Sequence, residues 1–180
     1  MKLKEILVLF LMVIISTFVF GDNHSNQVNS KMVEGLTYTN YIETELGMDI
    51  YWEFSENQEL FMMLKAPVSG WISIGFEPSK KMKGAKIIIV GFKDEEVILE
   101  EYYGNTQISH RKIKEKYITE FYGERTEEYS LAEFVIPLDN ESRYNSLQPG
   151  SIIKTIIAYH NSSDSFSRRH SKRDTIDINF

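Results

Sequence analysis

The stretch GWISIGFEPSKKMKGAK, residues 70–86, decides the fold of this chain. A glycine and a tryptophan lead into a short alternating apolar run, Trp71 to Phe76, which is typical of a β-strand with one buried face. The run breaks at Glu77-Pro78-Ser79, and the next residues form a basic loop that carries one methionine, Met82. The stretch therefore predicts a strand, a turn and a loop that presents an isolated thioether.

The N-terminal segment has the features of a secretory signal peptide. A basic start precedes an almost wholly apolar run over residues 6–20, and Gly21 offers a cleavage point. The run is short for a membrane span, although an uncleaved anchor is the alternative. We expect a signal peptide over residues 1–21, a flexible leader over residues 22–35 and one exported domain over residues 36–180. That domain would be periplasmic or secreted, with no membrane span in the mature chain.

Charge and cysteine content exclude several classes of function. The formal net charge is −6, and an acidic exported domain is a poor candidate for binding nucleic acid. The sequence contains no cysteine. Disulfides, thiolate metal sites and covalent c-type haem attachment, which requires Cys-x-x-Cys-His, are therefore excluded.

Short apolar runs separated by turns predict an all-β fold. Strands are expected at residues 50–54, 60–64, 71–76, 86–92, 97–103, 117–122, 129–136, 151–159 and 175–180. The run Ile87–Val90 is apolar on both faces, which predicts a central strand covered on both sides. Regular strand and turn spacing without a helical period indicates an antiparallel β-sandwich of about nine to eleven strands.

Two residues far apart in the sequence are candidate axial ligands of one haem iron. Met82 is either an adaptable core filler or, because it stands alone among lysines, a soft ligand that suits iron. His170 lies in a basic run, RRHSKR at residues 168–173, which is either a solvated loop or part of a site. Arg169 and Arg173 could pair with haem propionates, bind another anion or balance the acidic surface.

Other histidines and aromatic residues leave alternatives open. His160 follows an apolar strand and is a second candidate ligand or an ordinary strand-end histidine. His110 lies in a polar segment and is expected to be exposed, with a role at the rim of a site as the alternative. Trp71, Trp52 and Tyr102–Tyr103 could form a platform that stacks on a sugar ring, or belong to the core and sheet faces. The chain has no hydrolase or phosphate-binding motif, so we do not expect an enzyme.

The segment around Trp71 and Met82 resembles the signature of DOMON domains. The resemblance rests on residues 70–76, on Pro78-Ser79 and on the segment Met82-Lys83-Gly84-Ala85. The segment His170-Ser171-Lys172-Arg173 before the last strand is similar to exported bacterial members of the family. The resemblance implies an immunoglobulin-like β-sandwich that holds a ligand at one end. In cytochrome members this ligand is b-type haem, bound by a methionine and a histidine, and other members are thought to bind sugars.

Carried onto this chain, the resemblance implies non-covalent haem b with Met82 and His170 as axial ligands. Trp71, Arg169 and Arg173 would contact the cofactor, and His160 is the substitute for His170. The implied function is an exported electron-transfer module that serves a redox partner protein or a membrane electron carrier. The alternative is a carbohydrate or small-ligand binding module without haem. The chain departs from the family pattern after Ala85, where a lysine stands in place of the usual aspartate, which leaves the polarity of the ligand pocket open.

Overall fold

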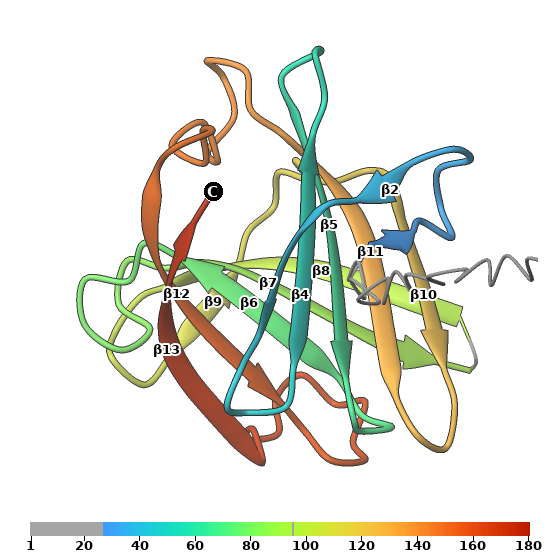
Figure 1. Cartoon of the computed structure of the whole chain (residues 1–180). Coiled ribbons are helices and arrows are strands. Elements are labelled where there is room, and N and C mark those ends of the chain that lie inside the picture. The colour runs from blue at the N-terminus through green and yellow to red at the C-terminus, as the bar shows by residue number, and fades with distance from the viewer. Residues whose placement is uncertain (1–26, 95) are drawn as a thin grey trace, which may run out of the picture.

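The computed structural model describes residues 27–94 and 96–180, and these residues form β-strands without any α-helix (Figure 1). In chain order the strands are β1 (Val28–Asn29), β2 (Thr37–Tyr38), β3 (Asn40–Glu43), β4 (Asp49–Phe54), β5 (Glu59–Ala66), β6 (Ile72–Phe76), β7 (Lys86–Lys93), β8 (Glu96–Gly104), β9 (His110–Lys112), β10 (Phe121–Arg125), β11 (Ser130–Pro137), β12 (Ile152–Tyr159) and β13 (Lys172–Asn179). A five-stranded sheet has the order β10-β11-β5-β4-β3, and a six-stranded sheet has the order β13-β12-β6-β7-β8-β9. All pairings within both sheets are antiparallel.

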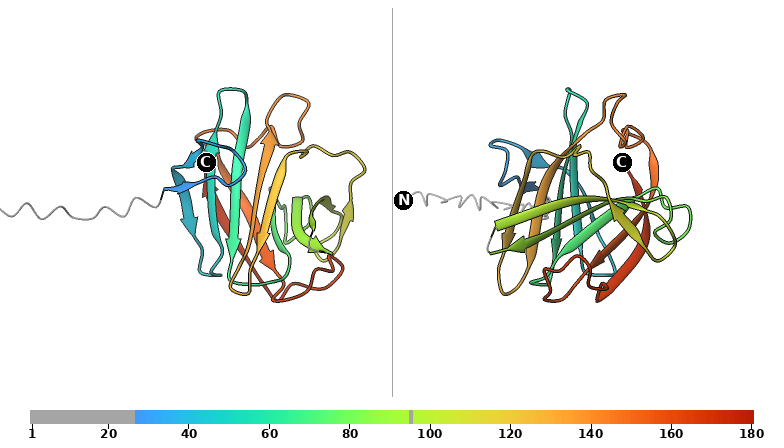
Figure 2. Two further views of the ribbon diagram at one scale, coloured as in Figure 1. Left: turned by 90° about the vertical axis from the view of Figure 1, so that its right-hand side faces the viewer. Right: turned by 180° about the vertical axis from the view of Figure 1, so that it is seen from behind.

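The two larger sheets lie face to face, with their strands running obliquely to each other (Figures 1 and 2). Alternation along β4 turns Ile50 and Trp52 into the space between the sheets, while Tyr51 faces the other side. β6 and β7 supply Ile74 and Ile88 from the opposite layer. The predicted antiparallel β-sandwich is confirmed, and the two sheets hold eleven of the strands described.

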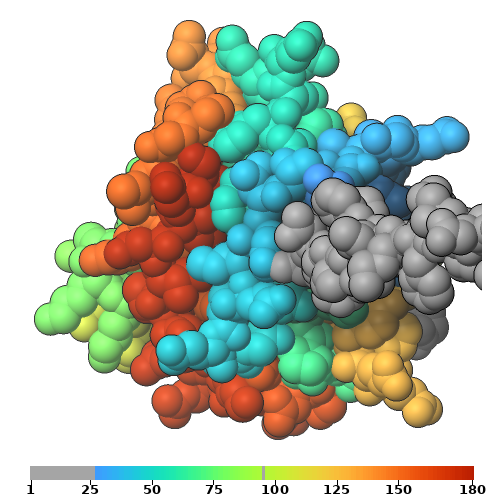
Figure 3. All heavy atoms as spheres, viewed as in Figure 1, coloured from blue at the N-terminus to red at the C-terminus, as the bar shows by residue number. Residues whose placement is uncertain are grey.

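The C-terminal residue closes one side of the sandwich. The ring centroid of Phe180 lies 5.6 Å from that of Trp52 and 6.2 Å from that of Phe76. Phe180 therefore packs against both sheets. The segment that leads to it lies beside β3 and β4 on the front face of the molecule (Figure 3). Side chains alternate between the two faces along this segment, because Ile178 and Phe180 are buried whereas Asp177 is exposed.

β7 is a central strand of its sheet and is covered on both faces, as its sequence predicts. Ile88 and Val90 belong to the core between the sheets. Ile87 and Ile89 face outward, yet both are buried in a second apolar cluster that includes Trp71. Other segments of the chain, among them the one that carries Phe166, therefore cover the outer face of the six-stranded sheet.

The N-terminal hairpin covers the outer face of the five-stranded sheet. β1 pairs with β2, and Tyr38 packs in a third apolar cluster with Met63 and Leu131. The fully buried carboxylate of Glu133 accepts hydrogen bonds from the Tyr38 hydroxyl and from the backbone N–H of Lys31. Part of the expected leader is thus anchored to the domain.

The expected signal peptide, residues 1–21, lies outside the described residues. Within the part that the structure describes, no helix has the length and hydropathy that a bilayer span requires.

The sequence misplaces two details of the polar region after β8. Residues 110–112 form β9, which adds a strand to the six-stranded sheet where only a polar excursion was expected. The strand expected at 117–122 starts only at Phe121, because Tyr117 and Ile118 donate their backbone N–H groups to the buried carboxylate of Glu101 instead of to a neighbouring strand.

Candidate functional site

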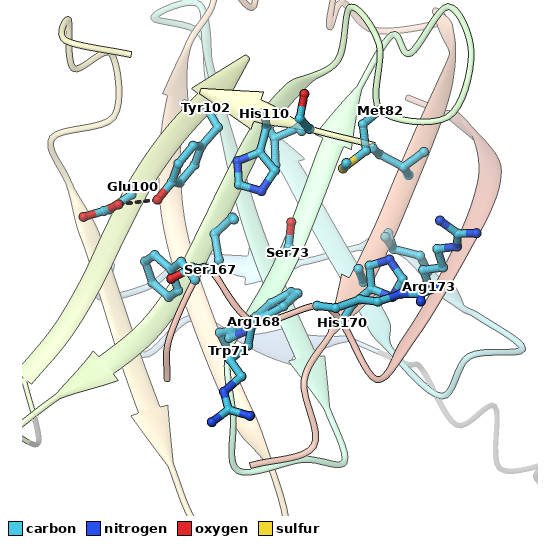
Figure 4. A pocket seen from close by; sticks show the side chains of 18 of the residues that line it. Trp71, Ser73, Met82, Glu100, Tyr102, His110, Ser167, Arg168, His170 and Arg173 are labelled. Carbon is cyan, nitrogen blue, oxygen red and sulfur yellow. Dashed lines mark hydrogen bonds between the residues drawn. The ribbon is translucent and has the colours of Figure 1, made fainter. Parts of the chain in front are cut away.

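A cavity of about 1230 Å³ lies on the outer face of the six-stranded sheet, and we call it the outer cavity (Figure 4). Its volume is ample for a cofactor, since ligand pockets commonly measure about 300–1,000 Å³. The floor consists of apolar side chains from β7 and β12. The residues that line the cavity include Trp71, Ser73, Lys81, Met82, Ile87, Ile89, Lys93, Glu100, Tyr102, His110, Ile156, Ala158, Asp164, Phe166, Arg168, Arg169, His170, Arg173 and Asp174.

Met82 reaches the outer cavity from a tightly turned loop between β6 and β7, which we call the Met82 loop (residues 77–85). The backbone N–H of Ser79 donates a hydrogen bond of 2.8 Å to the carbonyl of Lys83 across the turn, and the backbone N–H of Ala85 donates to the carbonyl of Met82. Gly84 adopts a positive φ of 85°, which glycine tolerates without a steric penalty. The loop backbone is therefore fixed, while the unbranched methionine side chain keeps its rotatable bonds.

His170 reaches the same cavity from the segment between β12 and β13, which we call the His170 loop (residues 160–171). Both ends of this loop are fastened by backbone hydrogen bonds, from Trp71 N–H to the Ser163 carbonyl and from Ser171 N–H to the Tyr159 carbonyl. Its middle is held by Phe166, which packs so closely on the sheet that a Cβ at Gly91 would lie 2.7 Å from the phenyl ring. The loop thus covers the sheet and forms one wall of the cavity.

Both imidazoles in the cavity are favoured in their neutral form. Burial lowers the pKa of His170, and the positive charges of Arg173 and Arg169 lower it further. Burial also lowers the pKa of His110. A neutral imidazole is the form that binds a metal ion, so the environment suits coordination.

The rim of the cavity carries a surplus of positive charge within an acidic protein. Five cationic residues line it: Lys81, Lys93, Arg168, Arg169 and Arg173. Three carboxylates also line it: Glu100 pairs with Lys112, Asp164 pairs with Arg125, and Asp174 accepts a hydrogen bond from the backbone N–H of Thr175. The rim therefore suits a ligand with anionic groups.

Lys86, which departs from the family pattern, does not contribute to this rim. Its ammonium group pairs with Glu77 and donates to the Ser146 hydroxyl at 3.2 Å. Lys86 does not line the outer cavity, so it adds no charged group to the cavity wall.

Two buried polar atoms of the cavity wall have no hydrogen-bond partner among the residues described. They are Nε1 of Trp71 and Nδ1 of His110. A buried polar group without a partner costs free energy, and a bound group in the cavity would supply the missing hydrogen bond. The His110 ring also packs edge-on against Tyr102, with ring centroids 4.5 Å apart.

The structure brings together Met82, His170, Trp71, Arg169 and Arg173 around one cavity. Their role as ligands stays a prediction, because nothing in the fold tests it directly. His110, expected to be exposed, also lines the cavity, and its sequence context carries little signal for this since its neighbours are charged.

Three other residues named from the sequence do not line the cavity. The Nδ1 atom of His160 accepts hydrogen bonds from the backbone N–H groups of Ser162 and Ser163, so this ring stabilises the turn that follows β12. Trp52 lies in the core between the sheets, and Tyr103 lies under Arg111. Of the residues of the proposed sugar platform, only Trp71 and Tyr102 line the cavity.

A family model described as DOMON domain matches residues 45–160, which include all strands from β4 to β12. This chain belongs to the DOMON domain family. The match extends over more than half of the chain and confirms the resemblance carried by the Gly70–Lys86 stretch. No curated protein matches the sequence.

Two solved structures share the fold of this DOMON domain. The cytochrome b domain of pyranose dehydrogenase from Coprinopsis cinerea superposes with a TM-score of 0.64 at 10% identity, over 85% of this chain and 86% of that one. The cytochrome domain of Myriococcum thermophilum cellobiose dehydrogenase gives a TM-score of 0.61 at 10% identity, over 86% and 87% of the two chains. At this identity the likeness establishes the fold alone.

Proposed function

We propose that this DOMON domain binds b-type haem in the outer cavity and carries single electrons, with Met82 and His170 as the axial ligands. The observation that carries the proposal is that a thioether and an imidazole, from loops far apart in the sequence, line one cavity with an apolar floor and a cationic rim. The similarity in fold to two cytochrome domains supports the same conclusion.

The residues of the cavity fit a haem group in three respects. The outward side chains of β7 and β12, among them Ile87, Ile89 and Ile156, offer an apolar surface to the flat macrocycle. The arginines at the rim match the two propionates, because guanidinium and carboxylate pair through two parallel hydrogen bonds. The partnerless Nε1 of Trp71 can donate a hydrogen bond to a bound group.

Haem bound in this way supplies one-electron redox chemistry without an open coordination position for oxygen. The protein residues would set its properties. The thioether of Met82 favours the reduced state and so raises the reduction potential. The apolar floor excludes water, and the His170 loop fixes one imidazole by the hydrogen bonds at its two ends.

An electron-transfer module needs a partner that supplies or accepts the electron. We therefore propose that the domain serves a redox partner protein or a membrane electron carrier rather than acting as an enzyme by itself. We also propose that the domain is exported, because the N-terminal sequence has the pattern of a signal peptide.

Haem titration into the purified protein tests the proposal. We expect one equivalent to bind and the reduced protein to give the absorption spectrum of a six-coordinate low-spin b haem. A protein that binds no haem, or binds it without a stoichiometric end point, would contradict the proposal.

A sugar or other small polar ligand is the second candidate. This candidate is favoured because Trp71, Tyr102 and Glu100 line one cavity. The Glu100 carboxylate accepts a hydrogen bond from the Tyr102 hydroxyl at 2.5 Å (Figure 4). Aromatic faces with nearby carboxylates suit a sugar ring. This candidate predicts a change in tryptophan fluorescence on addition of sugars to haem-free protein, and no low-spin haem spectrum.

A further inference from the structure

Three methionine and histidine side chains of the described residues line the outer cavity, one more than the two axial positions of a haem iron can bind. Met82, His110 and His170 all line it, whereas the iron of haem has two axial positions. The proposed function accounts for Met82 and His170 and leaves His110 without a role. Its Nδ1 is buried without a hydrogen-bond partner among the described residues, so the atom is free to bind a group that enters the cavity.

His110 belongs to the same wall as Met82. The register of the sheet pairs His110 with Gly104, so the two residues share a face with Tyr102, which also lines the cavity. Gly104 in turn exchanges backbone hydrogen bonds with Gly84 and Ala85 at the end of the Met82 loop. Met82 and His110 therefore flank the same strand end, and His170 reaches the cavity from a different loop (Figure 4).

The absence of a side chain at Gly104 allows the Met82 loop to pack against the end of β8. A Cβ at this position would lie 1.6 Å from the carbonyl oxygen of Met82. Because glycine has no Cβ, the Met82 loop settles directly against the end of β8, next to the partner strand that carries His110. Met82 and His110 thus line the same wall of the cavity.

We propose that His110 is a second iron ligand that exchanges with Met82 for the axial position opposite His170. This inference rests on the proposed haem function. The soft thioether of Met82 binds the iron in the ferrous state, and the imidazole of His110 binds it in the ferric state. This follows from the preferences of the two ligand types.

The ligand exchange requires one electron from the redox partner and no other reactant. One electron from the redox partner reduces the iron, the bond between iron and a His110 nitrogen breaks, and the bond between iron and the Met82 sulfur forms. Oxidation reverses both changes, and no proton needs to move. The fixed backbones on both sides confine the change to the side chains, of which methionine has the greater rotational freedom.

Ferric and ferrous absorption and electron paramagnetic resonance spectra of four haem-loaded proteins test the exchange, with dithionite as reductant. The proteins are wild type, Met82→Ala, His110→Ala and the double variant. We expect wild-type ferric protein to be low-spin without the far-red charge-transfer band of a thioether–ferric bond. His110→Ala gains this band, Met82→Ala keeps the wild-type ferric spectrum, and the double variant is high-spin in both states.

Two outcomes overturn the exchange while leaving haem binding intact. One is a wild-type ferric spectrum that already shows the thioether band; the other is a Met82→Ala protein as high-spin as the double variant. His110→Gln provides a second variant should alanine destabilise β9, and it must give the same band as His110→Ala. A wild-type protein that binds no haem overturns the proposed function itself, and the exchange falls with it.

Discussion

Asp164 of the His170 loop accepts a hydrogen bond from Arg125 of β10 at 2.6 Å, and this pair ties the loop of one sheet to the edge of the other. The Asp164 carboxylate also accepts a hydrogen bond from the backbone N–H of Phe92 at 3.4 Å, and the Arg125 guanidinium lies over the Phe92 ring at 4.8 Å. The wall that carries His170 is therefore fixed by an ion pair at the margin of the cavity.

Replacing Asp164 with asparagine should loosen this wall. We expect the free energy of unfolding to fall by about 0.5–1 kcal/mol, because the pair is only partly buried, and haem affinity to fall with it. Thermal unfolding and haem titration measure the two effects.

Lys31→Met provides the matched control, because Lys31 pairs with Glu124, the neighbour of Arg125 on β10, away from the cavity. It should lose comparable stability without any loss of haem affinity. Equal haem affinity in Asp164→Asn and wild type would show that the ion pair does not position the wall.

A methyl group at Gly104 should displace the Met82 loop. The added Cβ would lie 1.6 Å from the Met82 carbonyl oxygen, so we expect Gly104→Ala to cost at least about 1–3 kcal/mol of stability and to weaken haem binding. Gly35→Ala is the comparison, since Gly35 has a φ of +80° but a Cβ added there would meet no atom within 4 Å. It should cost about 1–2 kcal/mol through backbone strain alone and leave haem affinity unchanged. Parallel losses of haem affinity in both variants would refute this role of Gly104.

The cations of the rim should contribute to affinity through the propionates. We expect the double variant Arg169→Gln, Arg173→Gln to bind haem about 2- to 30-fold more weakly, since each partly exposed ion pair contributes about 0.2–1 kcal/mol. Added salt should reduce the difference from wild type. Arg111→Gln serves as control, because Arg111 lies over Tyr103 and does not line the cavity. A double variant that binds haem as tightly as wild type would contradict the pairing of these arginines with the propionates.

The ion pair between Glu77, the first residue of the Met82 loop, and Lys86, which directly follows the loop, should make stability depend on pH. Burial would raise the pKa of Glu77, but hydrogen bonds from Lys86 and Ser146 and the charge of Lys86 outweigh it and lower this pKa below its ordinary value of 4.5. The folded state then binds this proton less readily than the unfolded state, so the stabilisation is complete above about pH 4.5 and is lost as the pH falls through the lowered pKa.

Glu77→Gln should therefore be less stable than wild type at neutral pH, by no more than about 1 kcal/mol because the carboxylate is partly exposed. The difference should vanish in strong acid. Urea unfolding at a series of pH values measures it, and a difference that persists unchanged in acid would contradict the assignment.

The sequence predicts the strands of the sandwich because alternation and β-branched runs report burial locally. Ile87–Val90 indicates a strand covered on both faces, and the structure confirms it. The position of His110 could not be predicted in this way, since it depends on the pairing of His110 with Gly104 across a polar hairpin. The same limit applies to His160, whose ring nitrogen is used by two backbone N–H groups that only the folded loop brings to it.

The reduced spectrum of His170→Ala tests most directly whether His170 is an axial ligand of bound haem. His160→Asn is the control, because asparagine keeps an acceptor for the N–H groups of Ser162 and Ser163. We predict that wild type and His160→Asn give a six-coordinate low-spin b haem and that His170→Ala loses it. A low-spin spectrum retained in His170→Ala, or lost in His160→Asn while His170→Ala keeps it, would contradict axial ligation by His170.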